Sequence, residues 1–304
     1  DVFIPDSVTT IEQGAFADCI SLERIIILDV VTDIGEEAFY GCSSLKHIVI
    51  PSSVTKIKKD SFSECESLIT VVIPSSVKII DNYAFSGCSS LKNINIPSSI
   101  TNINNGAFSG CSSLTNIIIP NSVTTISLNA FSHCSSLENI VIPDSVTSIG
   151  KWAFYQCTKL KSVTISSSIT TIEVATFAEC NSLETVLIPN SVTNIETDAF
   201  LSCNSKHFKL FITNELKQTL KRNNIPIGVD LDNKKKIITY IINPPDLTQT
   251  PEESNYNIQP KIPLAPDGSN YNNIPNYNQR RGNGISKKKK KKKKKSTKRK
   301  KRTS

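Results

Sequence analysis

The chain has 304 residues and a formal net charge of +8, which is divided unevenly along it. Residues 1–204 carry 10 basic and 20 acidic residues, a net charge of −10, and residues 205–304 carry 25 basic and 7 acidic residues, a net charge of +18. This asymmetry predicts that the C-terminal part, and not the acidic body, meets polyanions. No stretch approaches 18 consecutive apolar residues, so no transmembrane helix is predicted.

The first residues resemble the end of a repeat whose beginning is missing. Val2-Phe3-Ile4-Pro5 matches the last part of the unit described below, and the chain contains no Met. The sequence therefore predicts an N-terminally truncated fragment, in which a missing signal peptide says little about the intact protein.

A constant interval of 23 residues governs residues 1–204. Nine phenylalanines, from Phe16 to Phe200, precede by three residues nine cysteines at the same interval. The cysteines are Cys19, Cys42, Cys65, Cys88, Cys111, Cys134, Cys157, Cys180 and Cys203. A fixed period of this length is typical of a solenoid, in which each repeat buries its apolar face against its neighbours. We therefore predict about nine stacked coils.

Each coil is expected to contain two short strands and a turn. The segment Leu-x-x-Ile/Val-x-Ile alternates in period two and ends at Pro, which predicts a strand. Val-Thr-x-Ile predicts a second strand, and Ala-Phe-x-x-Cys predicts a tight turn or a single helical turn. Stacked coils would place strands about 4.8 Å apart in a continuous parallel sheet, about 45 Å long for nine coils. The Ser column that includes Ser53 and Ser76, and the Thr column that includes Thr55, are expected to bind turn backbones.

The unit Pro51-Ser-Ser-Val54-Thr55-x-Ile57-x3-Ser61-Phe62-x2-Cys65-x-Ser67-Leu68 resembles the BspA-type leucine-rich repeat. The resemblance covers about two-thirds of the chain. It implies a leucine-rich-repeat solenoid that binds through its surface. Proteins of this family occur in anaerobic bacteria and protist parasites, and several are surface antigens implicated in adhesion to host matrix. The resemblance does not imply a particular ligand.

The cysteine column permits a disulfide ladder, a metal site or a row of buried thiols. Neighbouring coils would bring the Cα atoms within disulfide range, but nine cysteines cannot pair fully. Metal sites favour Cys-x2-Cys or nearby His at tetrahedral geometry, and neither is indicated by the sequence. Free Cys is a small, often buried hydrophobe, so we predict inert core thiols and no metal or cofactor.

No catalytic motif is apparent. A phosphate-binding Gly-rich loop, His-Glu-x-x-His and Gly-x-Ser-x-Gly are all missing from the sequence. His133 precedes Cys134, but neighbours in a turn point apart, and His47 has no repeated partner. We predict a protein that is not an enzyme and has no small-molecule substrate.

The outward positions of the Leu-x-x-Ile/Val-x-Ile strands are the candidate protein-binding face. One column is polar and the next, two residues on, is largely apolar. The polar column is Arg24, His47, Thr70, Asn93, Asn116, Asn139, Ser162 and Thr185; the other is Ile26, Val49, Val72, Asn95, Ile118, Val141, Thr164 and Leu187. Exposed apolar stripes mark partner sites. The alternative is that β-propensity alone selects Ile and Val there, or that sheet twist half-buries them.

Residues 205–243 are expected to form a small α/β cap on the last coil. Lys206 stands where Leu is expected and Lys209 where Ile is expected. A short helix is predicted over 214–224, where Leu216 and Leu220 lie one turn apart, and a strand over 237–242. A terminal repeat needs such an element to cover its core.

Residues 244–286 form a predicted disordered Pro/Asn/Tyr linker, followed by a polybasic tail over 287–304. From residue 280 onward there are sixteen basic and no acidic residues. The candidate polyanion-binding residues are Lys287, Lys291, Lys295, Lys298, Arg299, Lys300, Lys301 and Arg302. Nuclear import through an importin-type receptor or nucleic-acid binding, an anionic membrane surface, and a merely solvated tail all fit this run. Free thiols and the tail favour an intracellular location, nuclear or cytoplasmic, whereas the family resemblance favours the cell surface.

Overall fold

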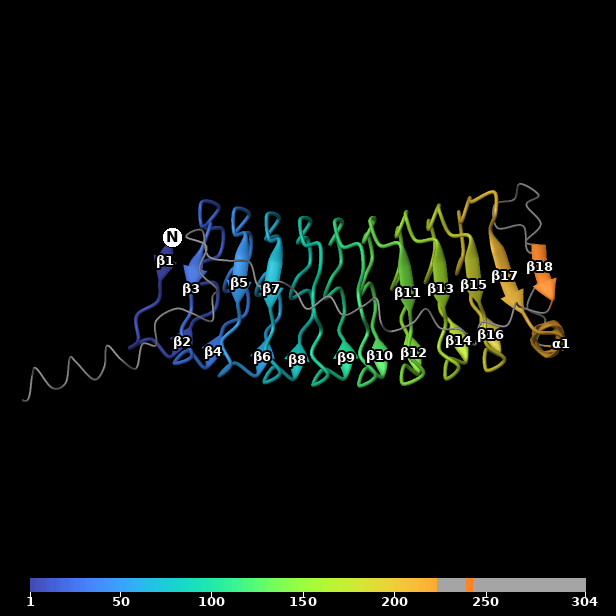
Figure 1. The fold of residues 1–304 in the computed structure, drawn as a ribbon, viewed down its shortest axis with the longest axis horizontal. Helices are drawn as coiled ribbons and strands as arrows, with labels where there is room; N and C mark the ends of the chain where they lie inside the picture. Colours follow the sequence, from blue (N-terminus) through green and yellow to red (C-terminus); the bar gives the residue numbers. More distant parts are fainter. Residues whose placement is uncertain (223–238, 243–304) are drawn as a thin grey trace, which may run out of the picture. The chain divides into compact units, whose positions relative to one another are not determined.

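The computed structural model describes residues 1–222 and 239–242. The predicted linker and polybasic tail lie outside the described residues. Residues 1–249 form one compact unit, and in its described part coils stack side by side from β1 to β18 (Figure 1). The fold is a parallel-strand solenoid with a 23-residue period, as predicted. Two series of short strands run along it.

The first series lies on one side of the solenoid, which we call the main face. Its strands are β1 (Val2–Phe3), β3 (Ile25–Ile26), β5 (His47–Val49), β7 (Thr70–Val72), β11 (Asn139–Val141), β13 (Ser162–Thr164), β15 (Thr185–Leu187), β17 (Lys209–Ile212) and β18 (Thr239–Ile242). Every pair within it is parallel, with partners 23 residues apart up to β15. In each three-residue strand the central residue is buried and its neighbours are not, because successive side chains point to opposite sides.

The second series forms the second face of the solenoid. Its strands are β2 (Thr10–Ile11), β4 (Asp33–Ile34), β6 (Lys56–Ile57), β8 (Ile79–Ile80), β9 (Asn102–Ile103), β10 (Thr125–Ile126), β12 (Ser148–Ile149), β14 (Thr171–Ile172) and β16 (Asn194–Ile195). The Ile of each strand from β2 to β14 is buried. The invariant Ile column of the sequence is therefore part of the core.

The prediction of one continuous sheet is wrong. The main-face ladder consists of the pairs β1–β3 and β5–β7 and a five-stranded sheet from β11 to β18, and the second face is similarly divided. No strand is assigned at residues 93–95 or 116–118 in the described chain. Both segments carry Asn at outward positions, and Asn is disfavoured in strands. Very short strands thus pair locally while the stack itself continues.

The core continues without a break because each residue type packs on its own copy. The rings from Phe16 to Phe200 stack with centroids 5.2–5.8 Å apart and planes within 13° of parallel. The predicted hydroxyl ladders are confirmed in part. Ser76 Oγ donates to the carbonyl of Val54 at 2.9 Å, and Thr124 Oγ1 to that of Thr101 at 3.3 Å, whereas the Oγ atoms of Ser145 and Ser191 in the Ser column have no partner among the described residues. Burial of the apolar core side chains supplies the main stabilisation of the fold.

Each Ala-Phe-x-x-Cys segment forms tight turns and no helix; one residue with positive φ precedes the segment, and a second is its fourth residue. They lie four positions apart in every coil, for example Tyr83 (φ 56°) and Gly87 (φ 72°). Thirteen of these positions are not glycine, and each holds a left-handed conformation that costs an L-residue about 1 kcal/mol or more. At Gly106 an added Cβ would lie 2.3 Å from the ring of Tyr83, so this glycine is also required by close packing.

The C-terminal end of the solenoid departs from the 23-residue repeat: strand β17 is shifted by one residue, and helix α1 follows it. Lys209 pairs with Thr185, so Leu210, and not Lys209, occupies the buried Ile column. The prediction for Lys209 was wrong because one extra residue shifts the register from 23 to 24. Helix α1 (Asn214–Arg222) buries Leu216 and Leu220 against the core, and β18 pairs with β17; the remaining predicted positions, 223–224 and 237–238, lie outside the described residues.

Candidate protein-binding face

The main face presents the two predicted columns on its outer side. None of the sixteen candidate residues is buried. In the largely apolar column, Val141 keeps 62% of its surface exposed, Ile118 57% and Val49 43%. Ile26, Val72 and Leu187 are half-buried. The outward orientation of the columns therefore holds in the structure, and their role in binding stays a prediction.

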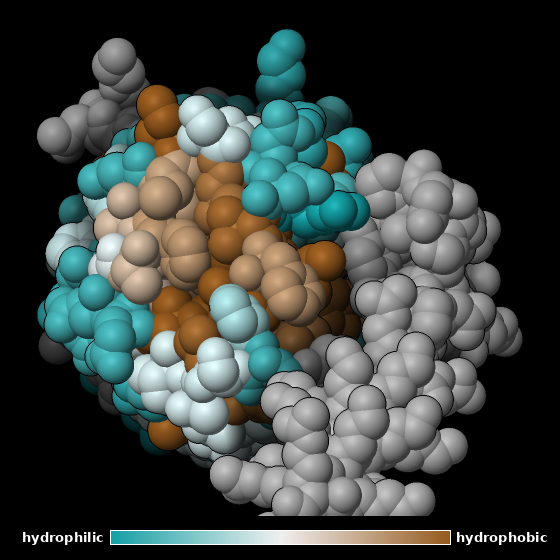
Figure 2. Space-filling view, turned by 90° about the vertical axis from the view of Figure 1, so that its left-hand side faces the viewer, coloured by the Kyte–Doolittle hydropathy of each residue, from teal (hydrophilic) through white to brown (hydrophobic). Residues whose placement is uncertain are grey.

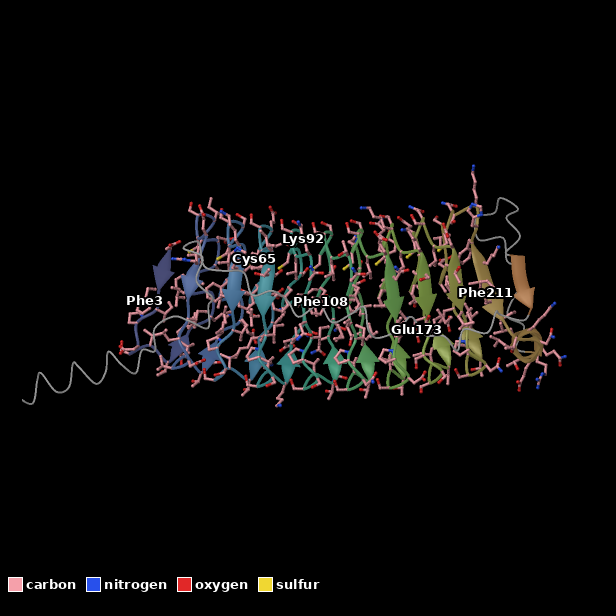
Figure 3. The ribbon with its side chains drawn as sticks, in the orientation of Figure 1. Phe3, Cys65, Lys92, Phe108, Glu173 and Phe211 are labelled. Carbon is pink, nitrogen blue, oxygen red and sulfur yellow. The ribbon has the colours of Figure 1, made fainter. Side chains whose placement is uncertain are left out.

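Two aromatic residues extend the apolar column at its ends. Phe3 pairs with Ile26 and is 59% exposed, and Phe211 pairs with Leu187 and is half-buried. Figure 3 places them on β1 and β17. Sequence reasoning missed Phe211 because of the extra residue before Leu210; the alternation Leu-Phe-Ile was the available signal. Asn95 and Thr164 divide the column into three apolar stretches.

The neighbouring polar column is largely paired between coils. His47 Nδ1 lies 2.8 Å from Thr70 Oγ1, so this histidine has a partner that the sequence did not predict. Burial, with a smaller contribution from the nearby Lys46 charge, lowers the pKa of His47. Further along, Ser162 Oγ donates to Asn139 Oδ1 at 2.7 Å. These side chains hold one another in place on the face.

Ion pairs beside these columns also join neighbouring coils. Arg24 contacts Asp1 at 3.0 Å, Lys46 contacts Glu23 at 2.9 Å, and Lys161 contacts Glu138 at 2.9 Å. All six side chains are substantially exposed, so each pair contributes little to stability, about 0–1 kcal/mol. The apolar column, which has no such internal partners, is the part of the face best suited to contact another molecule.

The cysteine column is a row of free thiols that is buried from Cys42 onward. Each of these eight thiols donates to the carbonyl of the Phe 26 residues earlier, at 3.1–3.3 Å. That carbonyl also accepts the backbone N–H of the cysteine in its own coil, as Phe16 does from Cys19 at 3.1 Å. Cys19 itself is exposed, so the prediction of core thiols is wrong for this one cysteine. It lies in the first coil of the described chain, on which no described coil is stacked at the N-terminal side.

Burial sets the acidity of these thiols. It raises the pKa of Cys42 to about 11 and of Cys203 to about 12, and the pKa values of Cys88, Cys111 and Cys134 well above the usual range. A thiolate is the reactive form of cysteine, so these groups are poor nucleophiles at neutral pH. In the described part of the chain, no group of three or more His, Cys, Asp or Glu side chains could hold a metal ion.

Elsewhere, His133 meets Tyr155 edge-on at 5.4 Å, and the Tyr155 hydroxyl donates to Glu179 at 2.9 Å. His133 is exposed while Cys134 is buried, so the structure does not bring them together as a nucleophile pair. Among residues 1–222 and 239–242, no helix is long and apolar enough to cross a membrane. The candidate tail residues Lys287–Arg302 lie outside the described part.

The repeat of this chain also matches a known protein family. The family description "BspA type Leucine rich repeat region" matches six copies over residues 1–115 and 102–222. The chain belongs to the BspA-type leucine-rich-repeat family. The Ile, Phe and Cys columns of this BspA-type chain are the repeated positions on which the resemblance in the sequence rested.

Solved structures of other leucine-rich-repeat proteins are also similar to this BspA-type chain. A leucine-rich cell surface protein from Faecalibacterium prausnitzii A2-165 is 27% identical, with 70% of this chain and 82% of that chain covered and a TM-score of 0.43. A leucine-rich-repeat protein from T. pallidum is 26% identical, with 64% and 77% covered and a TM-score of 0.42. A comparison with curated proteins found no match.

Proposed function

We propose that this chain is a non-enzymatic protein-interaction module that binds a protein partner on the main face. The observation that carries the proposal is the outward apolar column, in which Ile118 and Val141 are more than half exposed in adjacent coils. Apolar side chains gathered on a rigid surface, with a polar rim, are typical of binding sites. The ladders of the core hold the column in register, which reduces the entropy lost on binding.

The repeat supplies matched variants for the test. Ile118→Asn and Val141→Thr introduce the residues that the same column already holds at Asn95 and Thr164, so the fold is expected to persist. Thr125→Asn on the second face, which introduces the residue found at Asn102 one coil earlier, is the control. A photo-crosslinking amino acid at position 116, two residues before Ile118 on the main face, is expected to capture a partner. Adding Ile118→Asn/Val141→Thr should abolish this capture, and adding the control Thr125→Asn should leave it unchanged. Equal capture from position 125 would refute the proposal.

The second part of the proposal is that the basic segment from residue 280 onward localises the module, either to the nucleus or to an anionic membrane surface. Its sixteen basic residues would release counterions on binding a polyanion, so affinity should fall steeply with salt. The full chain is compared with one that ends at Gln279, on duplex DNA and on vesicles that contain phosphatidylserine. Equal binding by both chains would refute a role for the segment.

The alternative is a cell-surface adhesin or antigen that uses the same face to bind host matrix protein, as the family resemblance implies. Binding of the full chain to immobilised fibronectin, collagen and laminin distinguishes the two. Saturable binding that is lost in the Ile118→Asn/Val141→Thr variant would favour the adhesin. A nuclear signal that depends on the tail in cells would favour the intracellular module.

A further inference from the structure

The solenoid has a third side, formed by the Ala-Phe-x-x-Cys segments and the residue before each of them, which we call the turn side. Figure 2 looks along the solenoid from its N-terminal end and shows an apolar interior surrounded mostly by hydrophilic residues. Trp152 departs from this pattern, because it lies on the turn side with 40% of its surface exposed. It is the only tryptophan of the chain. A large exposed ring on a rigid surface is typical of a residue that contacts a ligand.

Planar polar side chains occupy one turn position in three consecutive coils. The fourth residue of the Ala-Phe-x-x-Cys segment is His133, Gln156 or Glu179 there, whereas the two preceding coils have Gly87 and Gly110. Each of the three polar residues has a φ of 57–60°, which glycine adopts freely and other L-residues adopt at a cost of about 1 kcal/mol or more. These polar groups are therefore present despite a conformational cost, as is common at binding sites.

Hydrogen bonds between coils hold the polar side chains in place. The Tyr155 hydroxyl and Gln156 Nε2 donate to the two carboxylate oxygens of Glu179, at 2.9 and 2.6 Å. Gln156 Nε2 also lies 3.2 Å from the Tyr155 hydroxyl oxygen, and the His133 ring meets the Tyr155 ring edge-on. The groups are thus ordered before a ligand binds, which reduces the entropy lost on binding.

Trp152 lies next to this network. Its carbonyl accepts the N–H of Tyr155 at 3.1 Å, so the two aromatic residues flank a single turn. The N–H groups of Trp152 and Gln156 donate to carbonyls of the following coil, at 3.2 and 2.9 Å. In that coil the positions of Trp152 and Tyr155 are taken by Ala175 and Ala178, which are small and buried, so neither projects beyond the aromatic side chains. An exposed ring therefore adjoins an ordered row of imidazole, amide and carboxylate groups.

We propose that the turn side of the coils that contain Cys134, Cys157 and Cys180 binds a neutral saccharide. A pyranose ring has an apolar C–H face, which matches the exposed Trp152 ring, and hydroxyl groups that both donate and accept hydrogen bonds. Gln156 Oε1 has no partner among the described residues, and each Glu179 carboxylate oxygen accepts one side-chain hydrogen bond and can accept another.

Charge and size fit the same ligand. The turn side of these coils, residues 128–133, 151–156 and 174–179, contains one Lys and one Glu, so it carries no net charge that would select an ion. Three coils at the strand spacing span about 10 Å, which is the length of about two pyranose rings. The site contains no residue of the main face, so it goes beyond the protein-binding function proposed above and does not depend on it.

Trp152 supplies the readout, because its fluorescence is the only tryptophan signal of the chain. The full chain is titrated with maltohexaose, cellohexaose and chitohexaose, which are neutral, and with a hexalysine peptide. A saturable change in fluorescence is expected with at least one saccharide and not with hexalysine. No change with any of the three saccharides would overturn the proposal. A change with hexalysine alone would assign the surface to a cationic ligand and also overturn it.

The repeat again supplies matched variants, which are compared by isothermal titration calorimetry with the saccharide that gives the largest fluorescence change. Trp152→Ala introduces the residue found at Ala175, and Gln156→Gly the residue found at Gly110, so the fold is expected to persist. Trp152→Ala should weaken binding about tenfold or more, because the apolar area that the ring buries is lost. Gln156→Gly should weaken binding about threefold or more through the loss of hydrogen bonds.

Tyr40→Ala is the control. Tyr40 is a 38% exposed ring on the turn side, but the next residue is Gly41, so it has no polar side chain at the adjoining position of its own coil. The control and the main-face variant Ile118→Asn/Val141→Thr should both bind the saccharide as the unmodified chain does. Unchanged binding by Trp152→Ala, or an equal loss in Tyr40→Ala, would overturn the proposal. Failure of the main face to bind a protein would leave this result unaffected.

Discussion

Raising the pH from 7.5 to 9.5 is expected to destabilise the solenoid strongly through its eight buried thiols. Unfolding returns each thiol to a pKa of about 8.5. In the folded chain burial raises these pKa values, to about 11 for Cys42 and about 12 for Cys203. Protons are therefore released only on unfolding. The stability that the thiols confer is complete below about pH 8.5 and falls as the pH rises from there toward the folded pKa values.

The magnitude follows from the number of thiols. At pH 9.5 an unfolded thiol is about 90% ionised, which favours unfolding by about 1.4 kcal/mol relative to neutral pH. Eight buried thiols together give about 11 kcal/mol. That is comparable to the whole unfolding free energy of a typical domain, about 5–15 kcal/mol. Much of the folded structure should therefore be lost within about one pH unit above 8.5.

Urea unfolding followed by circular dichroism at pH 7.5, 8.5 and 9.5, at constant ionic strength, measures the effect. The Cys111→Ala variant is the matched control, because it removes one fully buried thiol. The loss of unfolding free energy between pH 7.5 and 9.5 should be smaller in this variant by about 1.4 kcal/mol. The reasoning is refuted if the wild-type midpoint is the same at pH 7.5 and 9.5, or if Cys111→Ala leaves this loss unchanged.

Three substitutions test the packing and the turns, each by urea unfolding at pH 7.5. Phe108→Ala should cost about 3–5 kcal/mol, because it opens a cavity between two stacked rings; a loss below about 1 kcal/mol would contradict the ring ladder. Gly106→Ala should cost at least about 1 kcal/mol, since the new Cβ meets the Tyr83 ring and φ is +57°. Adding Tyr83→Ala should recover part of that loss, and strict additivity would exclude the contact. Glu37→Gly should stabilise the chain by up to about 1 kcal/mol by relieving a positive φ, whereas Glu37→Ala should not; equal effects of the two would show that this φ carries no strain.

The core positions were predictable because each of them recurs in nine coils of the sequence, so residue types can be compared at equivalent positions. Ile57 and Phe62 recur at fixed steps, so they must be buried whatever the exact path of the chain. Strand alternation then assigns Val49 and Ile118 to the outer surface. The same comparison identified the hydroxyl ladders. Comparing repeat positions predicts whether a side chain points into the core or toward solvent. It does not identify the molecule that the main face binds.

Features that depend on backbone conformation or on a single insertion were not predictable. Residues as different as Trp152 and Ala175 occupy the positive-φ positions, so no residue type marks them. The extra residue before Leu210 moves one strand by a full position, and only the strand pairing reveals it. The hydrogen bond from the Cys65 thiol to the Phe39 carbonyl was also not predicted, because burial alone already explained a cysteine at this position.

The glycine at position 106 has a consequence for the fidelity of folding. Because the core columns are nearly identical, a coil could stack on its second neighbour, with the intervening coil looped out, and still bury the same side chains. Tyr83 would then meet Asn129, which has a Cβ, in place of Gly106. Asp18 would meet Glu64 in place of Gly41, whose added Cβ would already lie 2.4 Å from the Asp18 carboxylate. We expect such mismatched pairs to disfavour skipped coils, so that the irregular residues of an otherwise uniform repeat help each coil to select its correct neighbour.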